Sequence, residues 1–368
     1  MDAGQLGNRI RQEREYAHLN QTDLAAAADL ERTAVNKIES GVRKVTALEL
    51  SRIAEALGVR MARLLEEPLP AIVSHRSSQG LDTADSKVDV LLAEFAHDVE
   101  FIQNLAPDRM APEVILDGPW DQPASSEAAE LLAVRVRADL GLGASAPVIR
   151  IHDVVAQLGL WAHSVNFGPD TADAGSLLLQ NGGVALVNSY NKVGRRRLAL
   201  AHELGHFLVH DEYSVDWRVS DAGGGIESRL DRFARALLLP STGLKQFWTD
   251  TLRRNGLRDA AVVTASHFQV DMSTLARRLG ELDLEGDSSQ IRATKTVQGD
   301  IIEYGLNVAF DMEDRSLPQQ LQKAVIALYR EQRISLERTL ELLRGTLAES
   351  ELPPRRTRVE GEFWNFVS

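Results

Sequence analysis

The stretch LALAHELGHFLVH, residues 198–210, constrains the chain more than any other, because its histidines recur at four-residue spacing. On a helix, residues four positions apart lie on one face, so His202, His206 and His210 form a stripe. Two imidazoles one helical turn apart can hold a single zinc ion, whose bonds to nitrogen are about 2 Å long. His202 and His210 are about 12 Å apart along a helix that rises 1.5 Å per residue, so one terminal histidine must have another role. The spacing therefore predicts a helix that carries a two-histidine metal site.

Glu203 directly follows the first histidine and completes the pattern His-Glu-x-x-His. In metallopeptidases with this pattern, the glutamate lies beside the metal and takes a proton from the attacking water. A catalytic zinc also needs a third protein ligand and one open position. Because the chain has no cysteine, an acidic side chain downstream is the natural third ligand. The acidic residues within reach in the sequence are Asp211, Glu212, Asp216, Asp221, Glu227 and Asp231.

Glu227 and Asp231 lie four residues apart in IESRLDRFARALLLP, residues 226–240. This stretch predicts a helix that ends at Pro240, with its apolar residues on the side opposite to the two acids. Glu227 would then ligate the metal, and Asp231 would accept a hydrogen bond from a ligating histidine and fix its tautomer. From the spacing alone, a solvated acidic face is an equally good interpretation.

The whole region 126–285 resembles the ImmA/IrrE family of zinc metallopeptidases. Members of that family pair His-Glu-x-x-His with a downstream Glu-x-x-x-Asn/Asp, then Phe-Ala and a Leu-Leu-x-Pro ending. RRRLALAHELGHFLVH followed by IESRLDRFARALLLP matches that order. The resemblance implies a minimal zincin-like fold, in which a small sheet lies against the active-site helix and offers an edge strand to an extended substrate. The hairpin that an Asn-Gly-Gly turn predicts at 176–189 would supply that strand.

The resemblance also implies roles for individual residues and a metal, which is zinc, or manganese in cells. The ligands would be His202, His206 and Glu227, with Glu203 as general base and Asp231 as the residue that orients a ligand. Two residues depart from the family pattern: Leu230 replaces a usually small residue and Arg229 an often acidic one. The candidates for stabilising the oxyanion are Tyr190, Arg197, His210 and Tyr213, and the sequence does not choose among them.

Residues 1–67 have the pattern of short amphipathic helices, and NQTDLAAAADLERTAVNKIESGVRKVT at 20–46 predicts two helices joined by a tight turn at Asp29. This region resembles the XRE/Cro-like helix-turn-helix family, in which the second helix enters the major groove of DNA. Asp29 and Glu31 stand where that family usually has a glycine and a capping hydroxyl, although aspartate tolerates the left-handed conformation. The resemblance implies a five-helix bundle. Its DNA contacts would come from Gln21, Thr22, Arg32, Thr33, Asn36 and Lys37.

The charge of the chain limits how it can bind DNA. The net charge of −12 repels nucleic acid overall, and the ten basic and eleven acidic residues within 1–67 leave that region at −1. We therefore expect weak, salt-sensitive affinity for non-specific DNA and a homodimer that reads two half-sites of an operator. The alternative interpretation of residues 1–67 is a helical bundle that contacts another protein and not DNA.

The rest of the chain predicts a linker with a helical segment at 68–125 and a mainly helical C-terminal module at 286–368. The first follows from a Pro-, Ser- and Gly-containing stretch, and the second from the amphipathic pattern of LPQQLQKAVIALYREQRISLERTLELL. The aromatic-rich end, GEFWNFVS, would dock on the sheet or on a partner. The expected class is α+β and mostly helical. Because we find neither a signal peptide nor a run of about 18 apolar residues, we expect a cytoplasmic protein with no membrane partner.

These features favour a bacterial regulator that combines operator binding with a zinc endopeptidase. By resemblance, its substrate is a helix-turn-helix repressor or an antitoxin-like partner, whose cleavage controls stress or mobile-element genes; its own linker at 68–125 is a further candidate. One alternative is a transcription factor whose zincin domain senses a metal or ligand without proteolysis. Another is an antitoxin that binds a toxin. Glu203 argues against sensing alone, since a sensor needs no general base.

Overall fold

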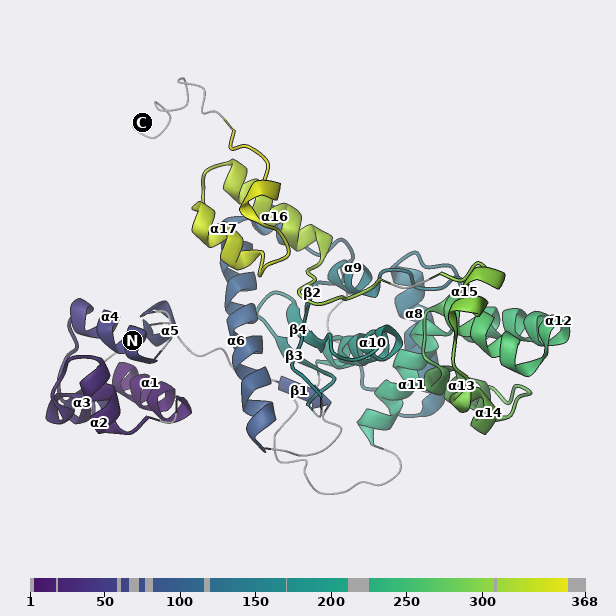
Figure 1. The fold of residues 1–368 in the computed structure, drawn as a ribbon, viewed down its shortest axis with the longest axis horizontal. Coiled ribbons are helices and arrows are strands. Elements are labelled where there is room, and N and C mark those ends of the chain that lie inside the picture. The colour runs from purple at the N-terminus through teal and green to yellow at the C-terminus, as the bar shows by residue number, and fades with distance from the viewer. Residues whose placement is uncertain are drawn as a thin grey trace. The chain divides into compact units, whose positions relative to one another are not determined.

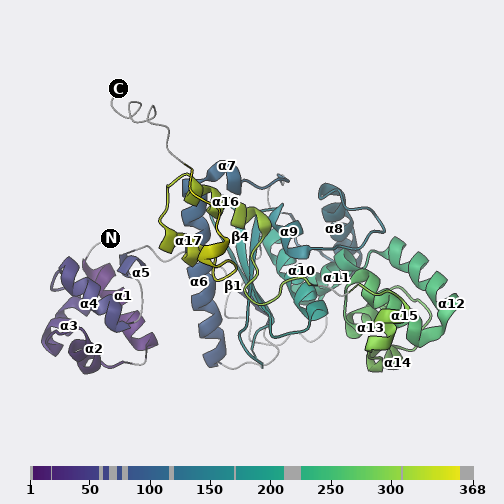
Figure 2. The same ribbon diagram turned by 45° about the horizontal axis from the view of Figure 1, so that its top comes forward.

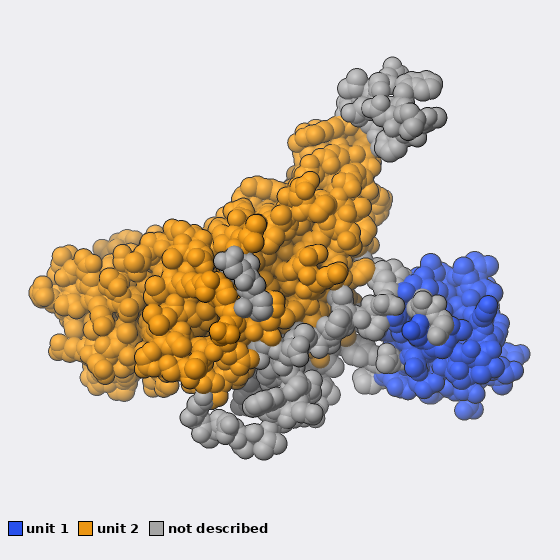
Figure 3. Space-filling view, turned by 180° about the vertical axis from the view of Figure 1, so that it is seen from behind, with its two compact units in different colours: residues 1–70 blue, residues 71–368 orange. Residues whose placement is uncertain are grey.

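The computed structural model describes residues 3–17, 19–57, 61–65, 73–76, 82–115, 120–169, 171–210, 225–307 and 310–356. The chain forms two compact units, residues 1–70 and residues 71–368 (Figure 3). None of the helices in the described parts of the chain has an apolar stretch of the length that crossing a bilayer requires.

The first unit is a bundle of five helices, as the sequence predicted. They are α1 (Ala3–Tyr16), α2 (Gln21–Ala27), α3 (Arg32–Glu39), α4 (Ala47–Leu57) and α5 (Met61–Leu65). Asn20 caps α2, because its side chain accepts hydrogen bonds from the N–H groups of Thr22 and Asp23, and the Asp23 carboxylate accepts from the N–H of Asn20. Asp29 adopts the left-handed conformation, with φ at 53°, in the turn that separates α2 from α3. The turn predicted at this position is therefore present without glycine.

A buried ion pair fixes α1 to α3. Glu39 is 2% exposed, and Arg14 donates to both of its carboxylate oxygens, from Nε at 2.6 Å and from Nη2 at 3.2 Å. Gln21 Nε2 donates to the same carboxylate at 2.8 Å. A buried carboxylate needs such partners, because burying it unpaired costs several kcal/mol, on the order of 3–5. The amide of Gln21, which we expected to contact DNA, thus also holds α2 against α3.

The second unit is built on a sheet of four strands in the order β1-β3-β4-β2. The strands are β1 (Val73–Arg76), β2 (Leu160–Val165), β3 (Ala174–Leu178) and β4 (Gly183–Asn188). β3 and β4 form the predicted antiparallel hairpin, and β2 runs parallel to β4. Gly182 in the hairpin turn has φ at 90°, and a Cβ there would lie 2.4 Å from the carbonyl oxygen of Gly159. Glycine is therefore required where the hairpin turn approaches Gly159, just before the first residue of β2.

The edges of this sheet differ from our expectation. We expected the hairpin to provide a free edge, but β1 pairs with β3 and β2 pairs with β4, so both hairpin strands are internal. β1 comes from the stretch 68–125 that we interpreted as a linker with a helical segment. Composition carries no information about pairing with a strand that is distant in sequence, so β1 could not be predicted from it.

Helices cover both faces of the sheet. Figures 1 and 2 show α6 (Asp82–Leu105) on one side of the strands and α10 (Val193–Val209) on the other. α11 (Ile226–Leu238) packs against α10 and also against α8 (Ser126–Asp139). The other helices up to residue 285 are α7 (Pro107–Met110), α9 (Ile151–Ala156), α12 (Ser241–Phe268) and α13 (Met272–Glu281). This arrangement places α10 between the sheet and α11.

The region 286–368 is mainly helical in its described part, as predicted, but its helices pack in two places. The elements are α14 (Ser288–Ala293), α15 (Gln298–Glu303), α16 (Gln319–Arg330), α17 (Leu336–Leu342) and a 3₁₀ turn (Glu349–Glu351). α14 contacts α12 and α13, whereas α16 contacts α6, α7 and α9 (Figure 1). The aromatic-rich end of the chain lies outside the described residues. The whole is an α+β protein that is mostly helical, as expected.

Candidate metal centre and nucleic-acid interface

Helix α10 carries two of the three histidines of the stripe. It runs from Val193 to Val209 and ends at His210, which takes the left-handed conformation with φ at 44° and is exposed. His202 and His206 lie one turn apart on the helix, with side chains that are 2% and 4% exposed. The third histidine therefore has a different role, which is to cap the helix.

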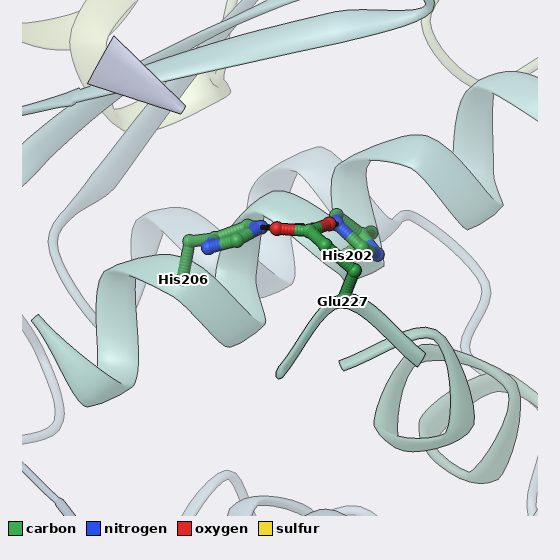
Figure 4. A group of neighbouring side chains, drawn as sticks. All are labelled: His202, His206 and Glu227. Carbon is green, nitrogen blue, oxygen red and sulfur yellow. Dashed lines mark hydrogen bonds and ion pairs between the residues drawn. The ribbon is translucent and has the colours of Figure 1, made fainter. Parts of the chain in front are cut away.

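Glu227, at the start of α11, meets these two histidines (Figure 4). His202 Nε2 lies 3.1 Å from Glu227 Oε2, and His206 Nε2 lies 3.5 Å from Glu227 Oε1. The two Nε2 atoms are 3.0 Å apart. Ligand atoms about 2 Å from a tetrahedral ion are separated by about 3.3 Å, so these distances suit one zinc ion. Glu227 is 51% exposed, which leaves this side of the group open to solvent.

Asp231, one turn further along α11, lies on the other side of His202. Its Oδ1 is 2.9 Å from His202 Nδ1. Because an ionised carboxylate only accepts hydrogen bonds, Nδ1 carries a proton, and Nε2 is the nitrogen that faces His206 and Glu227. A metal would therefore bind at Nε2 and take the place of any proton there, while Asp231 keeps the proton on Nδ1.

The charges at the site also suit a cation. Burial alone would lower the pKa of His202, but its hydrogen bonds with Asp231 and Glu227 raise that pKa above its ordinary value of 6.5. Burial alone would raise the pKa of Glu227, but hydrogen bonds with His202 and His206 hold it well below its ordinary value of 4.5. The group therefore offers an ionised carboxylate and two imidazoles, a donor set that fits zinc and needs no cysteine.

A residue of the sheet binds the carboxylate of Glu203. Its carboxylate Oε2 accepts a hydrogen bond of 2.6 Å from the hydroxyl of Ser176 in β3, and the residue is 0% exposed. Sequence reasoning missed Ser176, because its only signal is a hydroxyl within an otherwise apolar strand. The register of β3 against α10 decides its role.

Gly205 explains how α11 comes so close to α10. A Cβ at this position would lie 3.1 Å from both Leu230 Cδ2 and Phe233 Cδ1. Leu230 is fully buried, so the larger residue that departs from the family pattern fills space next to the glycine of HELGH. The other departure, Arg229, donates to the carbonyl oxygen of Ala124 at 3.0 Å. Neither departure disturbs the candidate ligands.

The expectation for Arg197 was wrong. We considered it for stabilising an oxyanion, but it is 0% exposed and its guanidinium donates to Asp311 and to the carbonyl oxygens of Val148 and Ile149. These three partners already occupy the guanidinium within the protein, so it is not available to stabilise an oxyanion. Tyr190 is 56% exposed and stays a candidate. The candidates Tyr213, Asp211, Glu212, Asp216 and Asp221 lie outside the described residues.

Replacing Asp231 with asparagine is expected to lower zinc affinity by about 10- to 100-fold, because the amide orients His202 less firmly and makes it a weaker ligand. Competition with a chelator of known affinity measures this change. The matched control is Asp283→Asn, which alters an exposed aspartate two residues beyond the end of α13. Equal zinc affinity in the Asp231 variant and the wild type would contradict this role.

In the first unit, α3 presents polar side chains to solvent. Arg32, Thr33, Asn36 and Lys37 are exposed, while Val35 on the opposite face is 1% exposed. Thr22, at the start of α2, is also exposed. Glu31 precedes α3 without capping it through its side chain. The predicted DNA-contacting residues of α3 therefore share one accessible face.

Comparisons with known proteins agree with this division. Residues 10–64 match the helix-turn-helix family, and residues 162–280 match the family described as the IrrE N-terminal-like domain. An uncharacterised HTH-type transcriptional regulator, y4wC, from Sinorhizobium fredii (strain NBRC 101917 / NGR234) is 38% identical over 73 residues, which are 20% of this chain and 51% of that protein. The control protein C.MunI of a Mycoplasma species is 35% identical over 63 residues, which are 17% of this chain and 85% of that protein.

A solved structure of a controller protein also matches a short part of the chain. The restriction-modification controller protein C.AhdI from Aeromonas hydrophila is 31% identical and covers 17% of this chain and 94% of its own, with a TM-score of 0.17. The chain thus spans about half the length of one curated relative and most of the other, and both matches are short compared with its own length. By its sequence and its five-helix bundle, the chain belongs to the helix-turn-helix regulator family and carries, after that domain, an IrrE N-terminal-like domain.

Proposed function

We propose that this protein is a DNA-binding transcriptional regulator whose second unit is a zinc-dependent endopeptidase. The observation that supports it most directly is the convergence of His202, His206 and Glu227 on one point, with their ligand atoms within 4.8 Å of one another. Glu203 lies between the two histidines in sequence and supplies a carboxylate of the kind that hydrolysis requires. The IrrE N-terminal-like match supports the same assignment.

In this mechanism His202, His206 and Glu227 would hold the ion, and Asp231 would fix the tautomer of His202. When bound, zinc supplies a Lewis acid that polarises the scissile carbonyl and makes water more acidic. The Glu203 carboxylate accepts a proton from the attacking water and delivers it to the nitrogen of the leaving amine. Ser176, by donating to Glu203 Oε2, holds that carboxylate in one orientation.

The substrate class that we propose is a helix-turn-helix repressor or an antitoxin-like partner, in the cytoplasm, with the regulator acting as a homodimer on its operator. The names of the relatives, a transcriptional regulator and a control protein, support the regulatory half of this proposal. A sensor without proteolysis would explain the metal ligands, but it would leave the carboxylate of Glu203 without a purpose. Manganese is the other metal that the same ligands could hold in cells.

Metal analysis together with a cleavage screen tests the proposal. Purified protein should bind one zinc ion per chain, and His202→Ala should bind none at the same free zinc concentration. Zinc-loaded protein should cut a helix-turn-helix protein encoded next to its gene, while the chelator-treated protein should not. One bound zinc with no cleavage of any such protein would favour a metal sensor, and equal zinc content in His202→Ala would contradict the ligand assignment.

The DNA-binding half gives its own prediction. Arg32→Ala and Lys37→Ala should each weaken operator binding. Loss of a contact with a base should cost about 1–3 kcal/mol and relax the sequence preference, whereas loss of a contact with phosphate should weaken binding to all DNA sequences by a similar factor. A phosphate contact that is lost also lowers the salt dependence of log K by about one unit of slope. Electrophoretic shift or fluorescence anisotropy at several salt concentrations separates these two cases. Arg315→Ala, an exposed arginine of the second unit, is the control.

A further inference from the structure

The short strand β1 forms one edge of the sheet and lies close in sequence to the boundary between the two units. It consists of four residues, Val73–Arg76, and pairs antiparallel with β3 at the edge of the sheet (Figure 1). The register places Val73 opposite Leu177, Ser74 opposite Ser176 and Arg76 opposite Ala174. This edge of β3 is one where an extended peptide can add to the sheet through main-chain hydrogen bonds.

The register also places β1 close to the proposed catalytic glutamate. Ser74 is directly opposite Ser176, the residue whose hydroxyl donates to Glu203 Oε2. Cα atoms of β1 also come within 8 Å of Cα atoms of α10, the helix that carries His202, Glu203 and His206. A peptide held in this register therefore lies opposite the strand residue that binds Glu203, and close to the helix that carries the candidate ligands.

Because β1 lies next to the boundary between the two units, cleavage of β1 would separate them. The first compact unit ends at Pro70, and β1 begins at Val73, at the start of the second unit. Each unit has its own core. A cut within or beside β1 would therefore separate the helix-turn-helix unit from the unit that carries the candidate metal centre.

We propose that the strand 73–76 is a substrate of the peptidase centre in the same molecule, and that its cleavage releases the DNA-binding unit. This inference rests on the proposed function. Pairing within one chain gives an effective concentration on the order of millimolar, so a short strand with few main-chain hydrogen bonds can still occupy the edge.

The reaction is a simple hydrolysis. The oxygen of one water molecule forms a bond to the carbonyl carbon of the scissile peptide, and the C–N bond of that peptide breaks. One proton of the water passes through Glu203 to the leaving nitrogen, so the products are a new carboxylate and a new amine. No reactant other than water and the chain itself is needed.

A cross-linking experiment tests the pairing without relying on activity. The natural chain has no cysteine, so within one molecule an introduced pair can form only the intended disulfide, which a non-reducing gel separates from cross-linked dimers. Arg76→Cys with Ala174→Cys, in metal-free protein that also carries Glu203→Gln, should oxidise to an intramolecular disulfide, because directly opposite residues have Cβ atoms about 5 Å apart. Arg76→Cys with Leu178→Cys is the control, because Leu178 lies four residues further along β3, about 13 Å away. A disulfide in the control as readily as in the matched pair would overturn the proposal.

Cleavage is followed in the zinc-loaded natural chain by mass spectrometry of the new chain ends. We expect two fragments whose ends lie within or beside 73–76, formed at a rate that does not depend on protein concentration. Glu203→Gln should slow this cut by about 100-fold or more, and Glu303→Gln, an exposed glutamate of α15, should leave it unchanged.

The outcomes distinguish this inference from the proposed function. If the matched cysteine pair forms its disulfide but the zinc-loaded natural chain is not cut at 73–76, β1 is a permanent strand of the sheet and the inference is overturned. If the same zinc-loaded protein still cuts a separate helix-turn-helix protein, the proposed function survives that result. A rate of linker cleavage that rises with protein concentration would show cleavage between molecules and would also overturn the inference.

Discussion

Replacing Glu203 with glutamine is expected to lower the rate of peptide cleavage by about 10²- to 10⁴-fold, which is the usual contribution of a general base. Glutamine has nearly the same shape and can still accept the hydrogen bond that Ser176 donates, but its amide cannot take a proton from water. Because Glu203 is not one of the three candidate ligands, zinc content should stay at one ion per chain. Cleavage of the partner protein and metal analysis on the same sample measure both quantities.

Two further measurements make this prediction decisive. Glu303→Gln should cleave at the rate of the natural chain, since Glu303 is an exposed residue outside the site. Cleavage by Glu203→Gln at the wild-type rate would contradict the mechanism. If Glu203→Gln keeps normal regulation in cells while Arg32→Ala and Lys37→Ala abolish it, the second unit acts as a sensor.

Much of the metal centre could be predicted from the sequence, because the relevant residues lie close together in the chain. Spacing of four residues brings His202 and His206 to one face of a helix whatever the rest of the chain does, and the same holds for Glu227 and Asp231. What spacing could not decide was whether the two helices face each other. That depends on Gly205, whose missing side chain leaves room for Leu230. The resemblance to a family, and not the spacing, selected Glu227 from six acidic residues.

The parts that sequence reasoning missed depend on contacts between segments that are distant in the chain. β1 joins the sheet through pairing with β3, and no pattern within four residues specifies that register. Arg197 looked like a residue of the site because it lies in the same helix as His202. Its actual partner, Asp311, is 114 residues away in sequence. Charged residues on a helix that is covered on both sides are therefore poor candidates for substrate contact until their partners are known.

Replacing Arg197 with methionine is expected to lower the free energy of unfolding of the second unit by about 3–5 kcal/mol, because it leaves the buried carboxylate of Asp311 without its cation. Asp311 also accepts hydrogen bonds from His152 Nδ1 and from the N–H of Ile151, each at 2.8 Å. The group therefore ties α10 to α9 and to the chain near residue 311. Urea unfolding of the metal-free protein measures the loss, since bound zinc would add its own stabilisation.

The pH dependence and a double variant test the cause of that loss. Burial alone would raise the pKa of Asp311, but His152 and Arg197 bring it below its ordinary value of 3.8. In the natural chain, the contribution of Asp311 to stability is therefore fully present above about pH 3.8 and is lost as the pH falls through the lowered pKa.

The double variant Arg197→Met with Asp311→Leu should recover part of the stability, because no buried charge is then left unpaired. Arg150→Met removes the ion pair of an exposed arginine with the half-buried Asp153 and should cost no more than about 1 kcal/mol. If Arg197→Met costs no more than Arg150→Met, the buried ion pair does not stabilise the helix that carries the candidate metal ligands.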